Sequence, residues 1–276
     1  MFDFFANIFG YVLNFVYNFV GNYGFAIIIF TILLKLIMLP MSIKQQKTMK
    51  KTTKIQAQVK VLQDKYQNDT VRLNQEMMDL YKNENMSPFS GCLSSILQMI
   101  IIISIFFLVS RPLTFMLHVN PEVINGYATE IQENSEERTS YQEIAIIKEK
   151  GAEDEKVRIN MEFLGLDLSE VPSKNFSDWK VFIIPTLYVL TSVVSMKITT
   201  NMQKAKMEEN NEKTEENKEE EEDAMAEMNK TMSYMMPIMS VSIALIAPLG
   251  LALYWLVNNL LMIAERLIIN KVCKDV

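Results

Sequence analysis

The sequence predicts an all-α polytopic membrane protein with five transmembrane helices, an N-terminal interfacial amphipathic helix and a cytosolic helical hairpin. Apolar residues make up 49% of the 276 residues and charged residues only 22%. The apolar residues are gathered in long stretches, each close to the roughly 20 residues that a helix needs to cross a bilayer. Because lipid offers no hydrogen-bond partners to backbone groups, each stretch is expected to be a helix.

The chain divides into five spans and the segments that connect them. The expected spans are 25–42, 88–110, 179–197, 231–248 and 249–270. The other segments are an extracytoplasmic interfacial helix at 1–24, a cytosolic helical hairpin at 43–87, an extracytoplasmic segment at 111–178, an acidic cytosolic loop at 198–230 and a cytosolic tail at 271–276. An odd number of spans puts the two termini on opposite sides of the membrane, and the basic residues described below put the N-terminus outside and the C-terminus in the cytoplasm.

The first 20 residues have eight aromatic side chains and no lysine or arginine. Asp3, Asn7, Asn14 and Asn18 fall within about 80° of one another on a helical wheel. This pattern is typical of an amphipathic helix that lies in the membrane interface. A signal peptide is not expected, because the segment lacks a basic start and a small-residue cleavage site. A sixth span remains the alternative.

Basic residues beside the spans predict the orientation, since lysine and arginine near a span end stay on the cytoplasmic side. Lys44 and Lys47 follow the first span, Lys197 ends the third, and Arg266 lies near the end of the fifth. Segment 112–178 has six basic and fourteen acidic residues. Its acidic character is consistent with the outer side of the membrane.

Segment 43–87 has apolar residues at helical spacing on both sides of a break at Asn68 and Asp69. This pattern predicts two helices whose apolar stripes face each other. Residues 41–86 include nine basic and five acidic residues. The basic surface either enforces the topology and contacts anionic lipid, or docks a partner. The candidate docking residues are Lys50, Lys51, Lys54, Lys60 and Lys65.

The second inner segment has the opposite charge. Residues 197–230 include eleven acidic and six basic residues, with an unbroken acidic run from Glu219 to Asp223. Such a composition cannot bury a core and predicts a solvated linker.

The sequence does not predict an enzyme. Cys92 lies in a span and Cys273 near the end of the chain, so neither a disulfide framework nor a metal site is expected. The sequence has no phosphate-binding loop and no catalytic constellation. His118, the one histidine, lies at a span exit where a surface role is expected. We therefore expect no cofactor.

Lys35 lies well inside the first span. In a regular helix it is ~15 Å from Phe25 and ~13 Å from Lys44. An ammonium group at a span centre costs about 2.5–3.5 kcal/mol on insertion scales. Lys35 should therefore face a hydrated cavity, pair with a carboxylate, or extend toward Ser42 and the interface. Glu265 falls close to the inner end of the last span, which favours a hydrated cavity over a structural ion pair.

Further polar residues lie within the spans. Each one alone has an ordinary interpretation as a helix-packing hydrogen bond, worth about 0.6 kcal/mol on average. Together with Lys35 they predict a hydrophilic groove between the helices. The candidate groove residues are Lys35, Thr31, Gln98, Ser192, Ser195, Trp255 and Asn258, with Asn259 beside them.

Seven stretches in order along the chain carry a resemblance to a known family. They are NYGFAIIIFTILLKLIMLP, IKQQKTMKK, LNQEMMDLYKNENMSPFSGCLSSILQM, FLGLDLS, WKVFIIPTLYVLTSVVSMK, MMPIM and GLALYWLVNNL. They resemble the YidC/Oxa/Alb family of membrane protein insertases over nearly the whole chain. Thr31 and Trp255 fall on groove positions of the family. Lys35 stands where the family usually has arginine, which keeps the charge but loses the bidentate guanidinium.

The chain also departs from the family pattern at several positions. Met196 replaces a glutamine of the groove, Ser90 replaces a glycine and Ile100 replaces a proline. The acidic insertion at 208–227 and the lack of a basic C-terminal tail argue against ribosome binding through the tail. These departures leave the five-span plan intact.

The resemblance implies an insertase in the bacterial plasma membrane that passes transmembrane segments of nascent proteins from the cytosol into the bilayer. The implied partners are nascent membrane proteins, membrane lipids, the ribosome, the signal recognition particle receptor and the Sec translocon, without direct contact to nucleic acid. The competing class is a small-solute or anion transporter or channel in which Lys35 binds an anion, although five spans without an internal repeat argue against it. A third class, a membrane scaffold protein that only organises partners, would not account for a charged residue at position 35.

Overall fold

The computed structural model describes residues 2–67, 69–84, 90–134, 140–211, 235 and 239–272. Most of these residues are helical. The helices are α1 (Phe2–Val20), α2 (Tyr23–Lys65), α3 (Thr70–Asn83), α4 (Ser90–Ser110), α5 (Pro112–Phe115), α6 (Pro121–Asn134), α7 (Gln142–Lys150), α8 (Ile183–Asn211) and α10 (Leu249–Val272). Short 3-10 helices cover Glu155–Val157, Pro172–Lys174 and Trp179–Phe182, and two strands, β1 (Glu162–Phe163) and β2 (Leu166–Asp167), form a hairpin.

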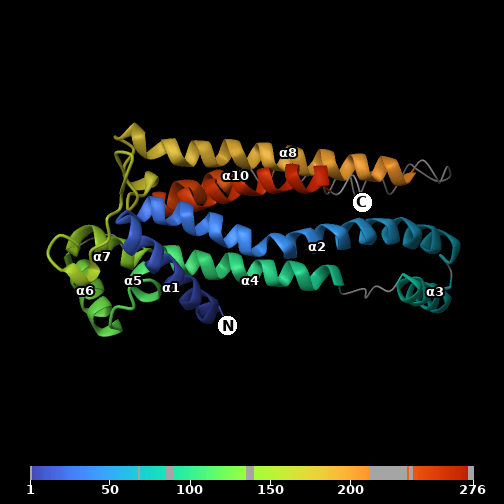
Figure 1. Cartoon of the computed structure of the whole chain (residues 1–276), viewed down its shortest axis with the longest axis horizontal. Helices are drawn as coiled ribbons and strands as arrows, with labels where there is room; N and C mark the ends of the chain where they lie inside the picture. Colours follow the sequence, from blue (N-terminus) through green and yellow to red (C-terminus); the bar gives the residue numbers. More distant parts are fainter. Residues whose placement is uncertain are drawn as a thin grey trace.

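Three long helices run in the same direction from one end of the molecule, and α4 returns beside them (Figure 1). Tyr23–Gln45, Trp179–Asn201 and Leu249–Ile268 are each long and apolar enough to cross a membrane. Between 22% and 28% of these stretches is buried inside the protein, so most of their apolar surface needs a lipid environment. The chain is therefore a multi-pass helical membrane protein.

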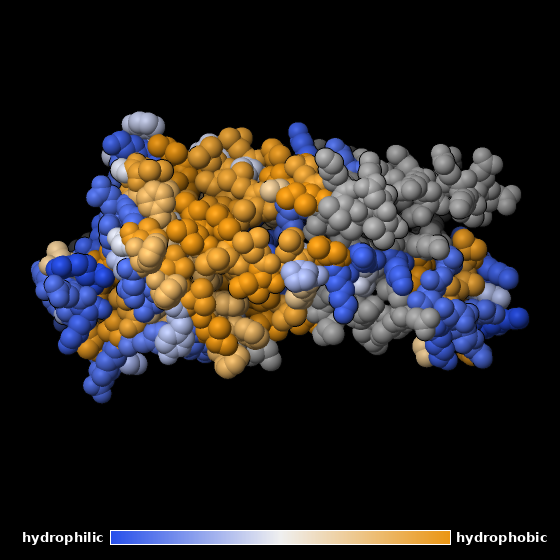
Figure 2. All heavy atoms as spheres, viewed as in Figure 1, coloured by the Kyte–Doolittle hydropathy of each residue, from blue (hydrophilic) through white to orange (hydrophobic). Residues whose placement is uncertain are grey.

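The other two expected spans are not seen as full-length apolar helices. Helix α4 contains a shorter apolar stretch, Ile96–Ser110, and the side chains of 90–95 lie outside the described residues. Of the expected span 231–248, only 235 and 239–248 are described, and 239–246 are helical. The five-span count stays a prediction. Figure 2 shows hydrophobic side chains over the middle of the long helices, between hydrophilic ends around α6 and α7 and around α3.

Helix α2 runs without interruption for 43 residues, through Pro40. Its N-cap is Asn22, whose side chain accepts a hydrogen bond from the backbone N–H of Phe25 at 3.2 Å. The expected boundary between span and hairpin at 42/43 is therefore not a helix boundary. The span and the first half of the hairpin form one helix.

A tight turn after Lys65 connects α2 to α3. Asp69 caps α3 by accepting a hydrogen bond from the N–H of Arg72 at 3.0 Å. Across the turn, the Tyr66 hydroxyl donates to Glu76 at 3.3 Å, and the Arg72 guanidinium lies 5.3 Å from the centre of the Tyr66 ring. Helix α3 is thereby held against the end of α2.

Helix α1 packs across α4 and α2 (Figure 1). Its buried face consists of Ala6, Gly10, Leu13 and Val16. A Cβ atom at Gly10 would overlap the carbonyl group of Phe115, so only glycine permits this approach. Large apolar side chains cover the opposite face and are exposed: Phe4, Ile8, Tyr11, Phe15 and Phe19. An apolar outer face of this kind suits contact with lipid.

The described parts of segment 111–178 fold over the end of the bundle at which α2, α8 and α10 begin (Figure 1). We call this the outer end, and the opposite one the inner end, after the predicted topology. Its hairpin pairs Glu162 with Asp167 and Phe163 with Leu166. The two turn residues, Leu164 and Gly165, both have positive φ values, 52° and 77°, as in a type I′ turn. The all-α expectation missed this small sheet.

The β-hairpin and the residues after it join the starts of α2 and α10. The Phe163 ring lies 5.1 Å from the Phe25 ring. At the start of α10, the backbone N–H groups of Leu249 and Gly250 donate to Glu170 and Leu168, both at 2.9 Å. The apolar segment 161–169 therefore packs on the ends of these helices.

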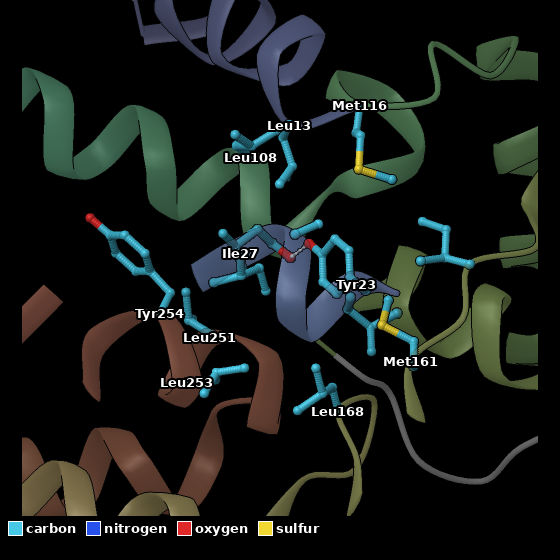
Figure 3. Close-up of a cluster of buried hydrophobic side chains, with 14 of the residues drawn as sticks. Leu13, Tyr23, Ile27, Leu108, Met116, Met161, Leu168, Leu251, Leu253 and Tyr254 are labelled. Carbon is cyan, nitrogen blue, oxygen red and sulfur yellow. Dashed lines mark hydrogen bonds between the residues drawn. The ribbon is translucent and has the colours of Figure 1, made fainter. Parts of the chain in front are cut away.

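The hydrophobic core lies at this same end of the molecule. Figure 3 shows Tyr23 and Ile27 of α2 among Leu13, Leu108 and Leu168 from other elements. Tyr23 is fully buried, and its hydroxyl donates to the carbonyl of Val109 at 3.4 Å. The long helices are thus fixed to one another mainly at their outer ends.

Candidate functional site

Lys35 pairs with Glu265 in the structure. The Nζ atom lies 3.3 Å from Oε2 of Glu265, and the side chains are 21% and 13% exposed. The sequence favoured a hydrated cavity over an ion pair, and that interpretation was wrong. Along their helices, Lys35 is about 18 Å from Tyr23 and Glu265 about 24 Å from Leu249. The Lys35 side chain spans this difference by extending toward the inner end.

Helix α10 also makes polar contacts with α8 on its other side. Arg266 donates to the backbone carbonyl of Ser195 at 3.3 Å and to the hydroxyl of Thr199. About two turns before Arg266 on α10, the Asn259 amide donates to the Ser192 hydroxyl of α8 at 2.7 Å. The charged and amide groups of α10 therefore bind both neighbouring helices.

We call this set of contacts the polar seam. It consists of Lys35 on α2, Ser192, Ser195 and Thr199 on α8, and Asn259, Glu265 and Arg266 on α10. Lys35 and Glu265 neutralise each other, so the seam has a net charge of one positive unit from Arg266.

Several predicted groove residues lie in or beside the polar seam. Lys35, Ser192 and Ser195 belong to it. Trp255 is half-buried, with its ring 5.5 Å from that of Tyr188 on α8. Thr31 lies one turn from Lys35 but is buried, and its hydroxyl donates to the Ile27 carbonyl of its own helix at 2.6 Å.

Two other predicted residues do not join the seam. Gln98 on α4 and Asn258 on α10 are half-buried. Within the described part of the chain, neither forms a hydrogen bond to a residue of the seam. For α10, the neighbouring Asn259 makes the contact to α8 instead.

Sequence reasoning did not assign Thr199, Arg266 or Glu265 to the site. Ser192, Ser195 and Thr199 recur three and four residues apart, which places their hydroxyl groups on one helix face. Asn259 and Arg266 have the same seven-residue spacing as Ser192 and Thr199. Two matching polar stripes on neighbouring spans were therefore a signal that these faces pair.

The predicted docking lysines lie on the inner half of α2. Lys51 and Lys65 are exposed, and the Lys65 ammonium is 5.3 Å from the Tyr66 ring centre. The side chains of Lys50, Lys54 and Lys60 lie outside the described residues. The two lysines that are described lie on the surface, and their docking role stays a prediction.

A pocket of about 400 Å³ lies at the outer end, between α4, α6 and α7. Arg111, Thr114 and Glu143 line it, and none of the predicted groove residues does. Burial raises the pKa of Glu143, although hydrogen bonds from Thr114 act in the opposite direction. These hydrogen bonds, at 3.0 Å to the N–H and 2.5 Å to the hydroxyl of Thr114, connect α7 to α5, which gives Glu143 a structural role.

No group of three or more His, Cys, Asp or Glu side chains is placed to hold a metal ion among the described residues. The features that distinguish the site are a charged seam inside a bundle of apolar helices and a basic helical extension at one end. They define a polytopic helical membrane protein with partly buried polar groups between its membrane helices.

The chain belongs to the 60Kd inner membrane protein family, that is, the YidC/Oxa family, whose model matches residues 15–275. It is 27% identical over 253 residues to a membrane protein insertase YidC of Geotalea daltonii, a match that covers 91% of this chain and 34% of that protein. It is 36% identical over 125 residues to a membrane protein insertase YidC of Francisella tularensis subsp. novicida, covering 43% of this chain and 23% of that protein. The chain thus spans about a third or less of the length of these relatives.

Proposed function

We propose that the protein is a membrane insertase and chaperone, which passes transmembrane segments of nascent proteins from the cytosol into the lipid bilayer along the polar seam. The observation that carries this proposal is the presence of Lys35, Glu265 and Arg266 within apolar helices. The relatives named above are membrane protein insertases, which supports the same activity here.

The physical need for such a seam comes from the polar residues that flank the transmembrane segment of a client, that is, of the nascent protein being inserted. The apolar part of a client partitions into lipid without help, whereas each charged residue meets a barrier of several kcal/mol in hydrocarbon. A polar path beside the lipid shortens the distance over which the charged residues of the flank lack water, hydrogen-bond partners and counterions. Release then follows from partitioning of the apolar part, and no nucleotide or cofactor is required.

The proposal includes the five-span topology. Helix α1 lies in the outer interface, with its exposed aromatic face in lipid. Segments 43–87 and 198–230 face the cytoplasm, segment 111–178 faces outward, and the C-terminus is cytoplasmic. This orientation puts the inner half of α2 and helix α3 where nascent chains arrive.

The partners follow from this arrangement. Nascent membrane proteins are the clients and membrane lipids the acceptor phase. Lys51 and Lys65 offer a basic cytosolic surface for the ribosome, the signal recognition particle receptor or the Sec translocon. No direct contact with nucleic acid is required.

Site-specific photo-crosslinking tests the proposed function. A photoreactive amino acid at Trp255 or Ser192 should crosslink to a nascent membrane protein, because both side chains are half-buried beside the seam. The matched control is Phe19, which is 89% exposed on α1 and should crosslink mainly to lipid. Solute flux through the purified protein in vesicles, without crosslinks to client chains, would instead indicate a transporter.

A further inference from the structure

The ion pair between Lys35 and Glu265 has a consequence for any client that uses Lys35. Both side chains are largely buried, so an isolated charge on either one is costly. A client that takes Lys35 away from Glu265 must therefore offer Lys35 another carboxylate. A client without an acidic group offers no such exchange.

The charged ends of the two partners lie at the same depth, because Nζ of Lys35 is 3.3 Å from Oε2 of Glu265. Their backbones differ in position. Glu265 lies three residues before Ile268, where the apolar stretch of α10 ends, or about 4.5 Å along the helix, whereas Lys35 lies ten residues before Gln45, the end of the apolar stretch of α2, or about 15 Å. The Glu265 carboxylate can therefore turn toward the nearby end of its apolar stretch when it is displaced.

The neighbouring arginine keeps α10 in place during such an exchange. Arg266 is held by Ser195 and Thr199 of α8, on the side of α10 away from Lys35. Breaking the Lys35–Glu265 pair therefore leaves the contact of α10 with α8 in place. The outer ends of α2 and α10 stay joined through Leu168 and Glu170.

We propose that Glu265 is an exchangeable counterion that makes the seam selective for acidic clients. An acidic residue in the flank of a client binds the Lys35 ammonium by displacing the Glu265 carboxylate, which moves to the inner aqueous surface. One carboxylate replaces another, so Lys35 remains paired throughout. This inference rests on the proposed function and adds a selectivity determinant to it.

The test compares two synthetic clients that differ only in charge. Each is a leucine-rich segment of about 20 residues, with a flank that carries either two aspartates or two asparagines. Crosslinking from position 255 to each peptide is measured against peptide concentration, in vesicles that contain the full chain. Thermal unfolding of each variant in the same vesicles shows that it is folded.

Glu265→Gln removes the competing carboxylate and keeps a side chain of similar size. We expect it to bind the aspartate peptide about tenfold more tightly, the change that 1.4 kcal/mol produces, and to leave the asparagine peptide unchanged. Glu265→Asp keeps the charge and should behave like the parent. Equal affinities of the Gln variant and the parent for the aspartate peptide would overturn the inference.

The charge-swapped double variant, Lys35→Glu with Glu265→Lys, provides the sharper test. It restores the ion pair in reverse, so a client flank with two lysines should replace the aspartate flank as the preferred one. If the double variant folds but keeps the aspartate preference, Glu265 is only a structural partner. If Lys35→Ala crosslinks both peptides as the parent does, Lys35 takes no part in client binding and the proposed function itself loses its support.

Discussion

Among the described residues, Lys35 is held by its ion pair with Glu265, and it lies on the helix that leads into the predicted hairpin. An ammonium group acts as a compact point charge, whereas a guanidinium binds a carboxylate through two parallel hydrogen bonds. The lysine therefore gives the seam a cation that exchanges partners readily. Its charge, rather than its shape, is the property on which insertion should depend.

Substitutions at position 35 test this dependence on charge. Lys35→Arg should retain insertion of clients with acidic translocated flanks, because the seam keeps its cation. Lys35→Ala should reduce it in part, and Lys35→Glu should reduce it most, because two carboxylates then face each other. Protease protection of client flanks in vesicles measures insertion, and equal insertion by all variants would refute the role of Lys35.

Lys35→Ala also leaves Glu265 without its partner, which lowers stability by up to about 3 kcal/mol. The control is Lys35→Ala combined with Glu265→Gln, which removes both charges. If the double variant is stable but still inserts acidic clients poorly, the defect lies in client handling and not in folding.

Glycines set the distance between elements at the outer end. A Cβ atom at Gly24 would overlap the ring of Phe163, whereas a Cβ atom at Gly126 in α6 meets nothing within 4 Å. Gly24→Ala should therefore destabilise the protein by about 1–3 kcal/mol. Gly126→Ala should stabilise it by about 0.4–1 kcal/mol. Thermal unfolding in detergent compares the two, and a stabilising Gly24→Ala would contradict the packing of the β-hairpin on α2.

At the scale of elements, the continuity of α2 joins the membrane span to the cytosolic hairpin. Pro40 lacks the backbone N–H that would bond one turn back, yet the helix continues to Lys65. A single helix therefore carries both Lys35 and the exposed basic residues Lys51 and Lys65. In the proposed function, the sites for client arrival and client passage would therefore lie on one element.

Deletion of residues 55–83 tests the role of the hairpin. The deletion should leave stable membrane residence, because the apolar stretch Tyr23–Gln45 remains. It should reduce client delivery, since α3 and the end of α2, with the candidate docking residues Lys60 and Lys65, are lost. The matched control replaces Lys51 and Lys65 by glutamine, which removes charge but keeps the helices. Unchanged client insertion in both variants would show that the hairpin is only a topological spacer.

At the scale of the whole molecule, the outer segment determines where the helices are joined. Its β-hairpin and its last residues bond to the starts of α2 and α10, and the core lies at the same level. Farther from that end, α2, α8 and α10 also meet through the polar seam. A client should therefore enter from the inner side, where the joints are polar and exchangeable.

This model requires a defined topology, which cysteine accessibility measures once Cys92 and Cys273 have been replaced. A cysteine at Ser140 should be labelled from outside, and one at Thr214 only after permeabilisation. A cysteine at Phe2 should be labelled from outside if α1 lies in the interface. Protection of Phe2 until permeabilisation would mean a sixth span, and labelling of Ser140 from the cytoplasmic side alone would invert the orientation.

The sequence by itself predicted the class of protein and the family. It also predicted the three long apolar helices that the structure contains. Hydropathy and charge beside a span are local properties, so a window of about 20 residues is enough to recognise them. It also singled out Lys35, Ser192 and Ser195, because polar groups are rare in apolar helices.

Only the tertiary structure decided which polar groups meet. Lys35 and Glu265 are 230 residues apart in the chain, and their pairing depends on which helices are neighbours and on their relative depth. That arrangement results from packing at the outer end, where Gly24 admits Phe163 and where Leu168 bonds to Gly250. Such contacts depend on side-chain shape across distant segments, a property that local hydropathy does not contain.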